Sequence, residues 1–494
     1  MSCYRSIQEN RMENSITVKT SRKVIEASLA YTAGNILLKG ISFLSIPIFA
    51  RILSQEDFGI FSTFMAYESI LFIVIGVSIH SSIKNAKYEF TDSLDHYVSS
   101  ITVISILNML LLLGLSNAFA GPLGKVTGFS WAILNLLVLH SFSSAIITVY
   151  NARIILDYNY KSYLKLALFN CISNIALSVL LCLTLFKNTR YLGRIMGLSL
   201  PVILISLIIL FLLYRKKRPS FQRKYFKFAL NYSIPMVPDG ISQCMLSSFD
   251  RILIRNMFGN MQAGIYSFAY NINLIYVIIA SSLSSVYTTW FYEKMNSKDY
   301  MKLVKYTMIY AVLLTGLCVL LICISPEVML ILGSEKYKDA VSCGIPILAG
   351  GYFSQLTILP MNMEHYYKKT VYTAFSTSSA LVINIALNYL LLPRFGYQFA
   401  AYTTVISYFF YFCFHLAVSI KVLKNKVLNY KLIWGNIMFL LLIAALAVFQ
   451  LNSLPIRLAL LMISALFLGI EILTIDKKFF QNLYHRFLFR HGTA

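Results

Sequence analysis

The sequence predicts an all-α polytopic membrane protein with about fourteen transmembrane helices. The first observation is composition: of 494 residues, 58% are hydrophobic and only 13% are charged, against roughly a quarter charged in soluble domains. The second is that apolar stretches long enough to cross a bilayer recur almost from end to end. The third is a net charge of +23, which in such a chain is typical of basic cytoplasmic loops rather than of nucleic-acid binding. A soluble protein is therefore excluded.

Crossing ~30 Å of hydrocarbon at 1.5 Å per residue requires about 20 apolar residues. Runs of this length define the expected helices in order, at residues 28–50, 58–80, 98–120, 129–150, 163–186, 192–214, 229–254, 263–285, 304–333, 343–363, 372–392, 397–420, 432–450 and 454–475. The residues before the first run are polar and basic, with neither the apolar core nor the cleavage site of a signal peptide. We therefore expect the first span to stay as an anchor.

The distribution of the basic residues predicts the topology. With a cytoplasmic N-terminus, the cytoplasmic segments and the span ends that adjoin them hold 31 of the 43 Lys and Arg residues, the opposite loops and their adjoining span ends hold 10, and Lys39 and Arg251 lie deeper inside spans. This asymmetry favours an even number of helices with both termini in the cytoplasm. The densest basic cluster, within residues 215–228, is expected to be a topological signal that also contacts anionic lipid.

Self-comparison of the sequence reveals an internal repeat at an offset of about 205–210 residues. Three segments match in the same order: Arg51–Ser62 with Arg255–Ser267, Asp157–Lys161 with Glu364–Lys368, and the residues from Asn174 with those from Asn384. An even number of helices per repeat predicts two bundles related by an axis along the membrane normal. The predicted organisation is an N-terminal cytoplasmic segment (1–27), a first six-helix bundle (28–214), a basic linker (215–228), a second six-helix bundle (229–422), two extra helices (423–475) and a cytoplasmic tail (476–494).

Signatures of catalysis and of metal binding are absent from the sequence. The eight cysteines show no C-x-x-C spacing, and most lie in apolar segments where Cys behaves as a small hydrophobic residue. No P-loop, H-E-x-x-H or G-x-S-x-G pattern occurs. We therefore expect no disulfide, no metal, no cofactor and no catalytic residue. Loops of at most roughly 20 residues also leave no room for an extramembrane domain.

Several ordered segments resemble one known family. They are Gly34-Asn35 through Pro47 and Arg51, Glu56–Gly59, Asp250-Arg251 before Gly264-Ile-Tyr, and Asn388–Gly396 followed by Ala400-Ala401 and Thr404. Over residues 25–475 the chain resembles the polysaccharide (O-antigen type) flippases of the multidrug/oligosaccharidyl-lipid/polysaccharide exporter superfamily. Gln398 and Phe399 depart from the small residues that this family tends to place before Ala-Ala.

The resemblance implies a function and its partners. Such proteins carry an undecaprenyl-diphosphate-linked oligosaccharide from the cytoplasmic to the periplasmic leaflet of the bacterial inner membrane by alternating access, coupled to H⁺ or Na⁺. The expected partners are this glycan, membrane lipids, and a polysaccharide polymerase with its chain-length regulator, and the chain is expected to be a monomer that binds no nucleic acid. The alternatives are a multidrug and toxin extrusion exporter, disfavoured by Lys39 and Arg251, and a membrane polymerase or ligase, disfavoured by the short loops.

Charges inside the membrane are the candidate site residues, because an unpaired charge there costs several kcal/mol. Lys39 lies twelve residues, ~18 Å, below Arg51 at the end of its helix, and Glu68 reaches a similar depth on the next helix. In the repeat these two positions become Gln243 and Asn273, so both charges are lost together. We hypothesise that Lys39 and Glu68 interact in at least one transport state, with a purely structural ion pair as the alternative.

Arg251 and Arg255 are four residues apart and share one helical face. A guanidinium binds a diphosphate better than an ammonium does, so both are candidate substrate-binding residues, although Arg255 could instead anchor the outer interface. Asp250 points away from Arg251 and requires another partner. The candidate coupling carboxylates are Glu68, Asp239, Asp250 and Glu364, and none can be singled out. Pro235, Pro238 and Gly240 predict an interruption at the start of the seventh span.

Overall fold

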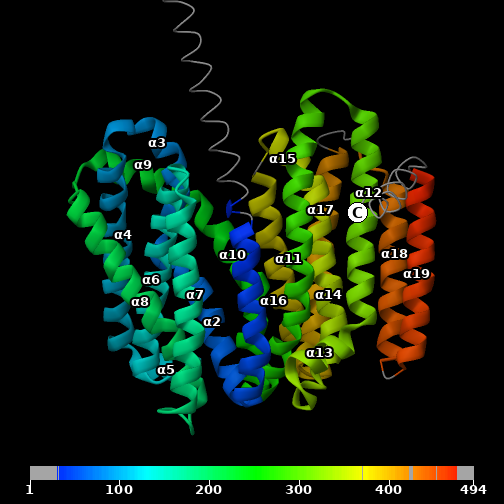
Figure 1. Cartoon of the computed structure of the whole chain (residues 1–494), viewed down its shortest axis with the longest axis horizontal. Helices are drawn as coiled ribbons and strands as arrows, with labels where there is room; N and C mark the ends of the chain where they lie inside the picture. The colour runs from blue at the N-terminus through cyan, green and yellow to red at the C-terminus, as the bar shows by residue number, and fades with distance from the viewer. Residues whose placement is uncertain (1–29, 32, 370, 422–426, 452, 476–494) are drawn as a thin grey trace, which may run out of the picture. The chain divides into compact units, whose positions relative to one another are not determined.

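The computed structural model describes residues 30–31, 33–369, 371–421, 427–451 and 453–475. The predicted cytoplasmic segment 1–27 and tail 476–494 lie outside these residues. The described chain consists of helices joined by short connections, and no β-strand occurs in it (Figure 1). The predicted all-α class is confirmed.

The long helices follow one another with short turns between them. They are Ala33–Ile52, α2 (Gln55–Gly76), α4 (Leu94–Ala118), α6 (Trp131–Leu156), α7 (Tyr160–Leu183), α8 (Arg190–Lys216), α10 (Val237–Phe258), α11 (Asn260–Asn296), α12 (Tyr300–Cys323), α14 (Ala340–Leu356), α16 (Val371–Phe395), α17 (Phe399–Lys421), α18 (Tyr430–Phe449) and α19 (Leu454–Ile475). Shorter helices are α3 (Ile83–Glu89), α5 (Ala120–Thr127), α9 (Arg223–Ser233), α13 (Ser325–Gly333) and α15 (Ile358–Tyr366).

Thirteen helices in the described part are long and apolar enough to cross a membrane. The predicted span that is missing from this set is α10, which has 22 residues but carries Asp239, Asp250, Arg251 and Arg255. Its polar side chains lower its mean hydropathy, so the predicted number of fourteen is not confirmed. The same polar side chains make α10 the helix to examine for function.

Prolines explain where the helices depart from the predicted boundaries. The predicted span 304–333 is divided into α12 and α13, with Pro326 in the first turn of α13. The predicted start at residue 229 is replaced by α9 and a short 3₁₀ turn at Ile234–Met236, after which α10 begins. Proline lacks an N–H group and fits only the first turn of a helix without loss, so the expected interruption near Pro235 and Pro238 is present.

The chain divides into two compact units. Unit 1 comprises Met1–Ile52 and Phe64–Ile241, and unit 2 comprises Leu53–Thr63 and Ser242–Ala494. The division falls within α10 and also within α2, whose first two turns belong to unit 2. These units are divided by contacts between residues, whereas the predicted bundles and the linker at 215–228 are divided by the sequence repeat. The predicted division therefore stays a prediction.

In unit 1, small residues allow α7 and α8 to approach closely. A Cβ atom on Gly197 would lie 2.3 Å from the Cα of Ser178, and one on Gly193 would lie 2.9 Å from the backbone N of Cys182. Because lipid is as apolar as leucine, helices in a membrane associate through such tight packing rather than through the hydrophobic effect. Close contact between these helices fixes the polar side chains that they carry.

In unit 2, two glycines from the two repeats face one another. A Cβ atom on Gly59 of α2 would lie 1.8 Å from the carbonyl oxygen of Asn260, and one on Gly264 of α11 would lie 1.9 Å from the carbonyl oxygen of Gln55. Gly59 corresponds to Gly264 and Gln55 to Asn260 in the repeat. The first turns of α2 and α11 therefore make a reciprocal contact in which only glycine fits.

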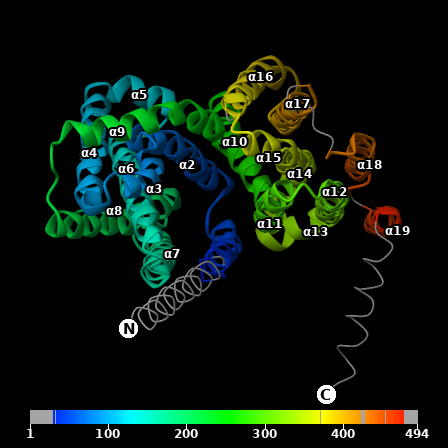
Figure 2. The same ribbon diagram turned by 90° about the horizontal axis from the view of Figure 1, so that it is seen from above.

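The last two helices, α18 and α19, both pack against α12 of unit 2 (Figures 1 and 2). The buried guanidinium of Arg457 on α19 donates to both carboxylate oxygens of Glu327 at 2.6 Å and to the carbonyl oxygen of Cys323 at 2.7 Å. These hydrogen bonds lower the pKa of Glu327 below its usual value. Arg457 therefore attaches α19 to α12 and α13 of unit 2.

Candidate functional site

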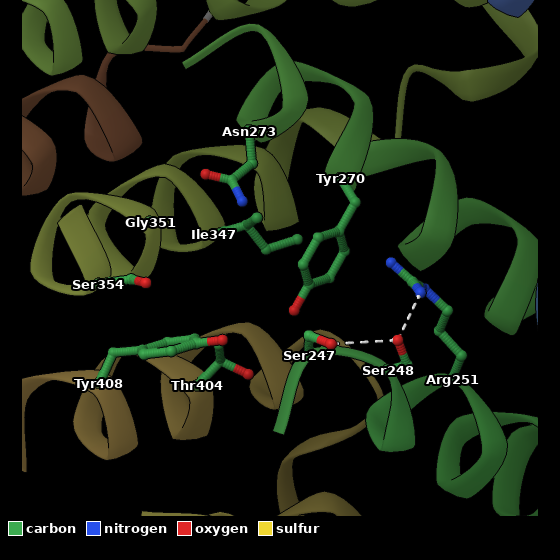
Figure 3. A pocket seen from close by; sticks show the side chains of 10 residues that line it. All are labelled: Ser247, Ser248, Arg251, Tyr270, Asn273, Ile347, Gly351, Ser354, Thr404 and Tyr408. Carbon is green, nitrogen blue, oxygen red and sulfur yellow. Dashed lines mark hydrogen bonds between the residues drawn. The ribbon is translucent and has the colours of Figure 1, made fainter. Parts of the chain in front are cut away.

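A cavity of about 220 Å³ lies within unit 2, between α10, α11, α14 and α17 (Figure 3). Hydroxyl, amide, guanidinium and aromatic groups surround it. The lining residues are Ser247, Ser248, Arg251, Tyr270, Asn273, Ile347, Gly351, Ser354, Thr404 and Tyr408. A concave site with a few converging polar groups is the usual form of a ligand-binding pocket.

Arg251 supplies the positive charge of this cavity. Its Nη1 donates to Ser248 Oγ over 3.3 Å, and its guanidinium carbon lies 4.7 Å from the centre of the Tyr270 ring. Its Nε is buried and has no hydrogen-bond partner among the described residues. A guanidinium over an aromatic face stays charged, so Arg251 retains donor capacity for an anionic ligand.

Neutral polar groups complete the lining, as the close-up shows for Tyr270, Tyr408 and Asn273 (Figure 3). Tyr270 Oη and Asn273 Oδ1 are buried without a partner in the described chain. A Cβ atom on Gly351 would lie 2.0 Å from Asn273 Oδ1, so this glycine makes room for the amide. Unsatisfied buried groups cost about 1–3 kcal/mol each, which a ligand could recover by hydrogen bonding to them.

Asp250, next to Arg251 in sequence, faces a different environment. Its side chain is 1% exposed and accepts hydrogen bonds from Tyr266 Oη (2.8 Å), Thr404 Oγ1 (2.7 Å) and Asn388 Nδ2 (2.7 Å). As predicted from the sequence, Arg251 is not among the hydrogen-bond partners of Asp250. The three donors satisfy the buried carboxylate, and the predicted role of Asp250 as a coupling carboxylate stays a prediction.

Two further candidates on α10 lie outside the cavity lining. Arg255 Nη1 donates to Asn256 Oδ1 over 2.8 Å, and the residue is partly exposed. Asp239 lies in the first turn of α10, in the part assigned to unit 1, with one carboxylate oxygen buried and unpartnered in the described chain. Arg255 and Arg251 therefore do not share a pocket in this conformation, and the role of each outside residue stays a prediction.

In unit 1, Lys39 and Glu68 are not brought together in this conformation. Lys39 is exposed, whereas the Glu68 carboxylate lies 4.0 Å from His140 Nε2 with a side chain that is 12% exposed. No ion pair between Lys39 and Glu68 occurs in the described structure. The hypothesis concerned at least one transport state, so it remains a prediction for another conformation.

Glu364, the last predicted carboxylate, pairs with a histidine in unit 2. Glu364 Oε1 lies 2.7 Å from His415 Nδ1, and both side chains are fully buried. The sequence marked Glu364 as a candidate, but nothing in the spacing indicated that α15 and α17 would bring it to His415.

Arg194, a partly buried arginine in unit 1, is not among the predicted site residues, because it lies only three residues into the expected span 192–214 and is counted with the preceding loop. It lies within α8, where its Nη1 donates to Asn174 Oδ1 (2.7 Å) and Ser178 Oγ (2.8 Å). Its guanidinium carbon lies 3.8 Å from the centre of the Phe49 ring. The repeat contained the signal, since Asn174 and Ser178 match Asn384 and Asn388 beside Asp250.

Metal-binding residues do not cluster in the described part of the chain: no group of three or more His, Cys, Asp or Glu side chains could hold a metal ion there. The cavity instead offers one guanidinium and several neutral polar groups to a ligand.

Comparison with known proteins identifies the family of the chain. The model of the polysaccharide biosynthesis protein family matches residues 24–291, more than half of the chain. The "capsular polysaccharide biosynthesis protein CapF" of Staphylococcus aureus is 22% identical over 402 residues, covering 76% of this chain and 94% of that protein. "Lsg locus putative protein 1" of Haemophilus influenzae is 24% identical over 329 residues, covering 63% of this chain and 78% of that protein.

Solved structures have the same fold. "Lipid II flippase MurJ, inward closed conformation" matches with a TM-score of 0.65 at 16% identity, covering 93% of this chain and all of that one. An inward-facing multidrug resistance MATE transporter of the MOP superfamily matches with a TM-score of 0.61 at 14% identity, covering 79% and 96%. The chain therefore belongs to the polysaccharide biosynthesis protein family, and its fold is that of the multidrug/oligosaccharidyl-lipid/polysaccharide exporter superfamily.

Proposed function

We propose that this multi-pass membrane protein is a flippase that moves an undecaprenyl-diphosphate-linked oligosaccharide across the cytoplasmic membrane, from the cytoplasmic to the outer leaflet. The observation that carries the proposal is Arg251, a charged guanidinium in a cavity with an unpartnered, buried Nε. Membership of a polysaccharide biosynthesis family and similarity to a lipid II flippase support the choice of substrate.

The chemistry of the cavity fits the polar end of such a substrate. A diphosphate accepts paired hydrogen bonds from a guanidinium, and sugars offer hydroxyl groups to Asn273 and Ser354 and apolar ring faces to Tyr270 and Tyr408. A separate groove of about 350 Å³ lies between α12 and α19 and is lined mostly by aliphatic side chains. This groove provides an apolar surface for the polyprenyl chain, while the polar end occupies the cavity.

The remaining elements of the proposal concern energy, orientation and partners. Transport is coupled to H⁺ or Na⁺, with carboxylates such as Asp250 and Glu364 as carriers. Both termini face the cytoplasm, because the basic residues concentrate in the loops on that side. The protein works as a monomer that supplies its product to a polysaccharide polymerase and its chain-length regulator.

Substitution of Arg251 tests the proposed substrate contact. A charge-assisted hydrogen bond contributes about 1.5–3 kcal/mol, so Arg251→Ala should lower surface polysaccharide by about 10- to 100-fold and raise inner-leaflet lipid-linked oligosaccharide. Arg251→Lys should retain part of the activity, because the charge remains but the fork is lost. The control is Arg394→Ala, since Arg394 is an exposed arginine on α16. Unchanged polysaccharide in both Arg251 variants, at normal protein levels, would refute the proposal.

The alternative function is drug export of the multidrug and toxin extrusion type, which the shared fold favours. Organic cations would be repelled by Arg251, so such an exporter would be expected to gain activity on its removal. Measuring accumulation of a cationic dye in cells with and without the chain discriminates the two functions: dye efflux that depends on the chain, with normal surface polysaccharide in its absence, would favour export.

A further inference from the structure

The buried pair Glu364 and His415 has hydrogen-bonding capacity that the fold does not use. Glu364 on α15 and His415 on α17 are in contact through Oε1 and Nδ1 at 2.7 Å, and each side chain is fully buried. The other two polar atoms, Glu364 Oε2 and His415 Nε2, have no partner in the described chain. A pair kept only for stability would be expected to satisfy these atoms, because each costs about 1–3 kcal/mol unpaired.

The surroundings of the pair are apolar. The His415 ring packs edge-on against Tyr411 and Phe414, with centroid distances of 4.7 and 5.9 Å. The elements packed against α15 and α17 are α11, α14 and α16. Their acidic, basic and histidine side chains, with those of α15, α17 and the next turn, are Glu293 and Lys294 on α11, Arg394 on α16, His365 on α15, Lys421 on α17, and Lys368 and Lys369.

The ion pair that Glu364 forms in the described structure is with a histidine that can be neutral or charged, and the nearest packed helices add little charge. Glu293 and Lys294 pair with one another at 3.5 Å, Arg394 lies at the far end of α16, and α14 carries no acidic or basic residue. Within the described structure, the ion pair of Glu364 is with His415. A net charge on the Glu364–His415 pair would therefore be buried away from water, which is energetically costly.

We propose that Glu364 and His415 form the proton-binding site of the transporter. Without the coupling proton, a Glu364 carboxylate beside a neutral imidazole has a net charge of −1. With the proton, the pair is neutral overall, whether the proton resides on the carboxyl group or on the imidazole. Because an uncompensated buried charge is costly, the closed arrangement of α15 and α17 favours the loaded pair, and release of the proton requires water to reach it.

This assignment rests on the proposed ion-coupled transport and separates the roles of two carboxylates. The Asp250 carboxylate accepts hydrogen bonds from three neutral donors, which satisfy both of its oxygens. Glu364 has one contact, and its Oε2 has no partner in the described chain. Proton binding is therefore assigned to Glu364 and His415, whose hydrogen-bonding capacity is unused, rather than to Asp250. The proton is taken from water on one side of the membrane and returned to water on the other.

A pH titration of the purified full-length chain tests the site without any substrate. Because the closed arrangement holds one proton more, the melting temperature of the native protein in detergent should fall as the pH rises from 5.5 to 8.5. Glu364→Gln removes the carboxylate and should abolish this fall, whereas His415→Gln keeps a buried carboxylate that still binds the proton and should retain the fall. The control is Asp157→Asn, which alters the repeat-equivalent carboxylate, exposed and paired with Arg153, and should retain the native profile.

A profile in Glu364→Gln that follows the native one would overturn the proposed proton site, and so would a flat profile in the native protein. In cells, Glu364→Gln should lower surface polysaccharide at least 10-fold while Asp157→Asn does not. A flattened titration with normal polysaccharide would leave proton binding in place and refute its coupling to flipping. The two readouts thus separate failure of the proton site from failure of the proposed function. If His415→Gln does not fold, the Glu364→Gln titration alone decides.

Discussion

The two repeats place equivalent polar residues on equivalent helices, but these residues hydrogen-bond to an arginine in the first repeat and to an aspartate in the second. In unit 1, Asn174 and Ser178 of α7 accept hydrogen bonds from Arg194 of α8. In unit 2 the matching helix α16 carries Asn384 and Asn388, and Asn388 donates to Asp250 of α10. Amide groups both donate and accept, so the same helix surface serves either sign of charge. The repeated framework therefore does not fix the ionic chemistry that it supports.

The position equivalent to Arg194 makes the exchange clearer. At the offset of 210 residues that aligns Asn174 with Asn384, Arg194 corresponds to Thr404. Thr404 donates to Asp250 Oδ2 over 2.7 Å and also lines the cavity beside Arg251. A second equivalent pair behaves in the same way: Asp157 is 57% exposed and bonded to Arg153, whereas Glu364 is fully buried. Unit 2 has thus buried carboxylates where unit 1 has a partly buried arginine and an exposed carboxylate.

The largest loss of stability is expected on substitution of Asp250, the buried carboxylate of α10 in unit 2. Asp250→Ala leaves the donors of Tyr266, Asn388 and Thr404 without their acceptor, and buried unsatisfied groups cost about 1–3 kcal/mol each. The free energy of unfolding in detergent should therefore fall by about 3 kcal/mol or more. Thr404→Val, which removes one of these donors, is the matched comparison and should cost about 1 kcal/mol. A loss in Asp250→Ala no larger than that in Thr404→Val would mean that the cluster contributes little.

A smaller effect is expected where the repeats remain alike, at Gly59 and Gly264. Gly59→Ala and Gly264→Ala each push a Cβ atom into a carbonyl group of the other helix, and overpacking of this kind costs about 1–3 kcal/mol. Since the contact is reciprocal, the two variants should lower the melting temperature by similar amounts. Gly435→Ala is the control, because nothing lies within 4 Å of a Cβ atom there. A clear inequality between Gly59→Ala and Gly264→Ala would contradict the reciprocal contact.

The smallest effect is expected at Asp157. Its bond to Arg153 is 2.6 Å long, but the carboxylate is mostly exposed, and exposed ion pairs contribute about 0–1 kcal/mol. Asp157→Asn should therefore lower the free energy of unfolding by no more than about 0.5 kcal/mol, measured by thermal unfolding in detergent. A loss of several kcal/mol would show that unit 1 depends on its carboxylate as strongly as unit 2 does.

Periodic apolar runs predicted the helical class and most spans, because bilayer thickness leaves few alternatives for an apolar chain. The prediction was weakest on α10, where polar side chains lowered the signal, and at α12 and α13, where Pro326 divides one apolar run. Of the site, Arg251 and Asp250 could be singled out as charges in apolar sequence. Their partners could not, since the positions of Tyr270, Asn388 and Thr404 depend on tertiary packing of three other helices.

The same reasoning explains Glu364 and Arg194. Glu364 was recognised as a candidate, but His415 lies 51 residues away and only the packing of α15 on α17 brings the two together. Arg194 lies in the first turns of α8, at one end of the expected span 192–214, where a cation is typical of the membrane interface and does not indicate a buried contact. In the repeat, its partners Asn174 and Ser178 match Asn384 and Asn388, which mark polar helix surfaces in both halves.

The glycine contact between α2 and α11 differs in kind from these ionic clusters. It joins backbone to backbone, so it has no proton to exchange, no ion to release and no rotamer to change when it forms or parts. Its strength should consequently be insensitive to salt and to acidity, unlike that of the buried carboxylates. A transporter that contains both kinds of contact can respond to protons or ions at its buried carboxylates. Its glycine contact, which should not depend on pH or salt, holds the first turns of α2 and α11 together.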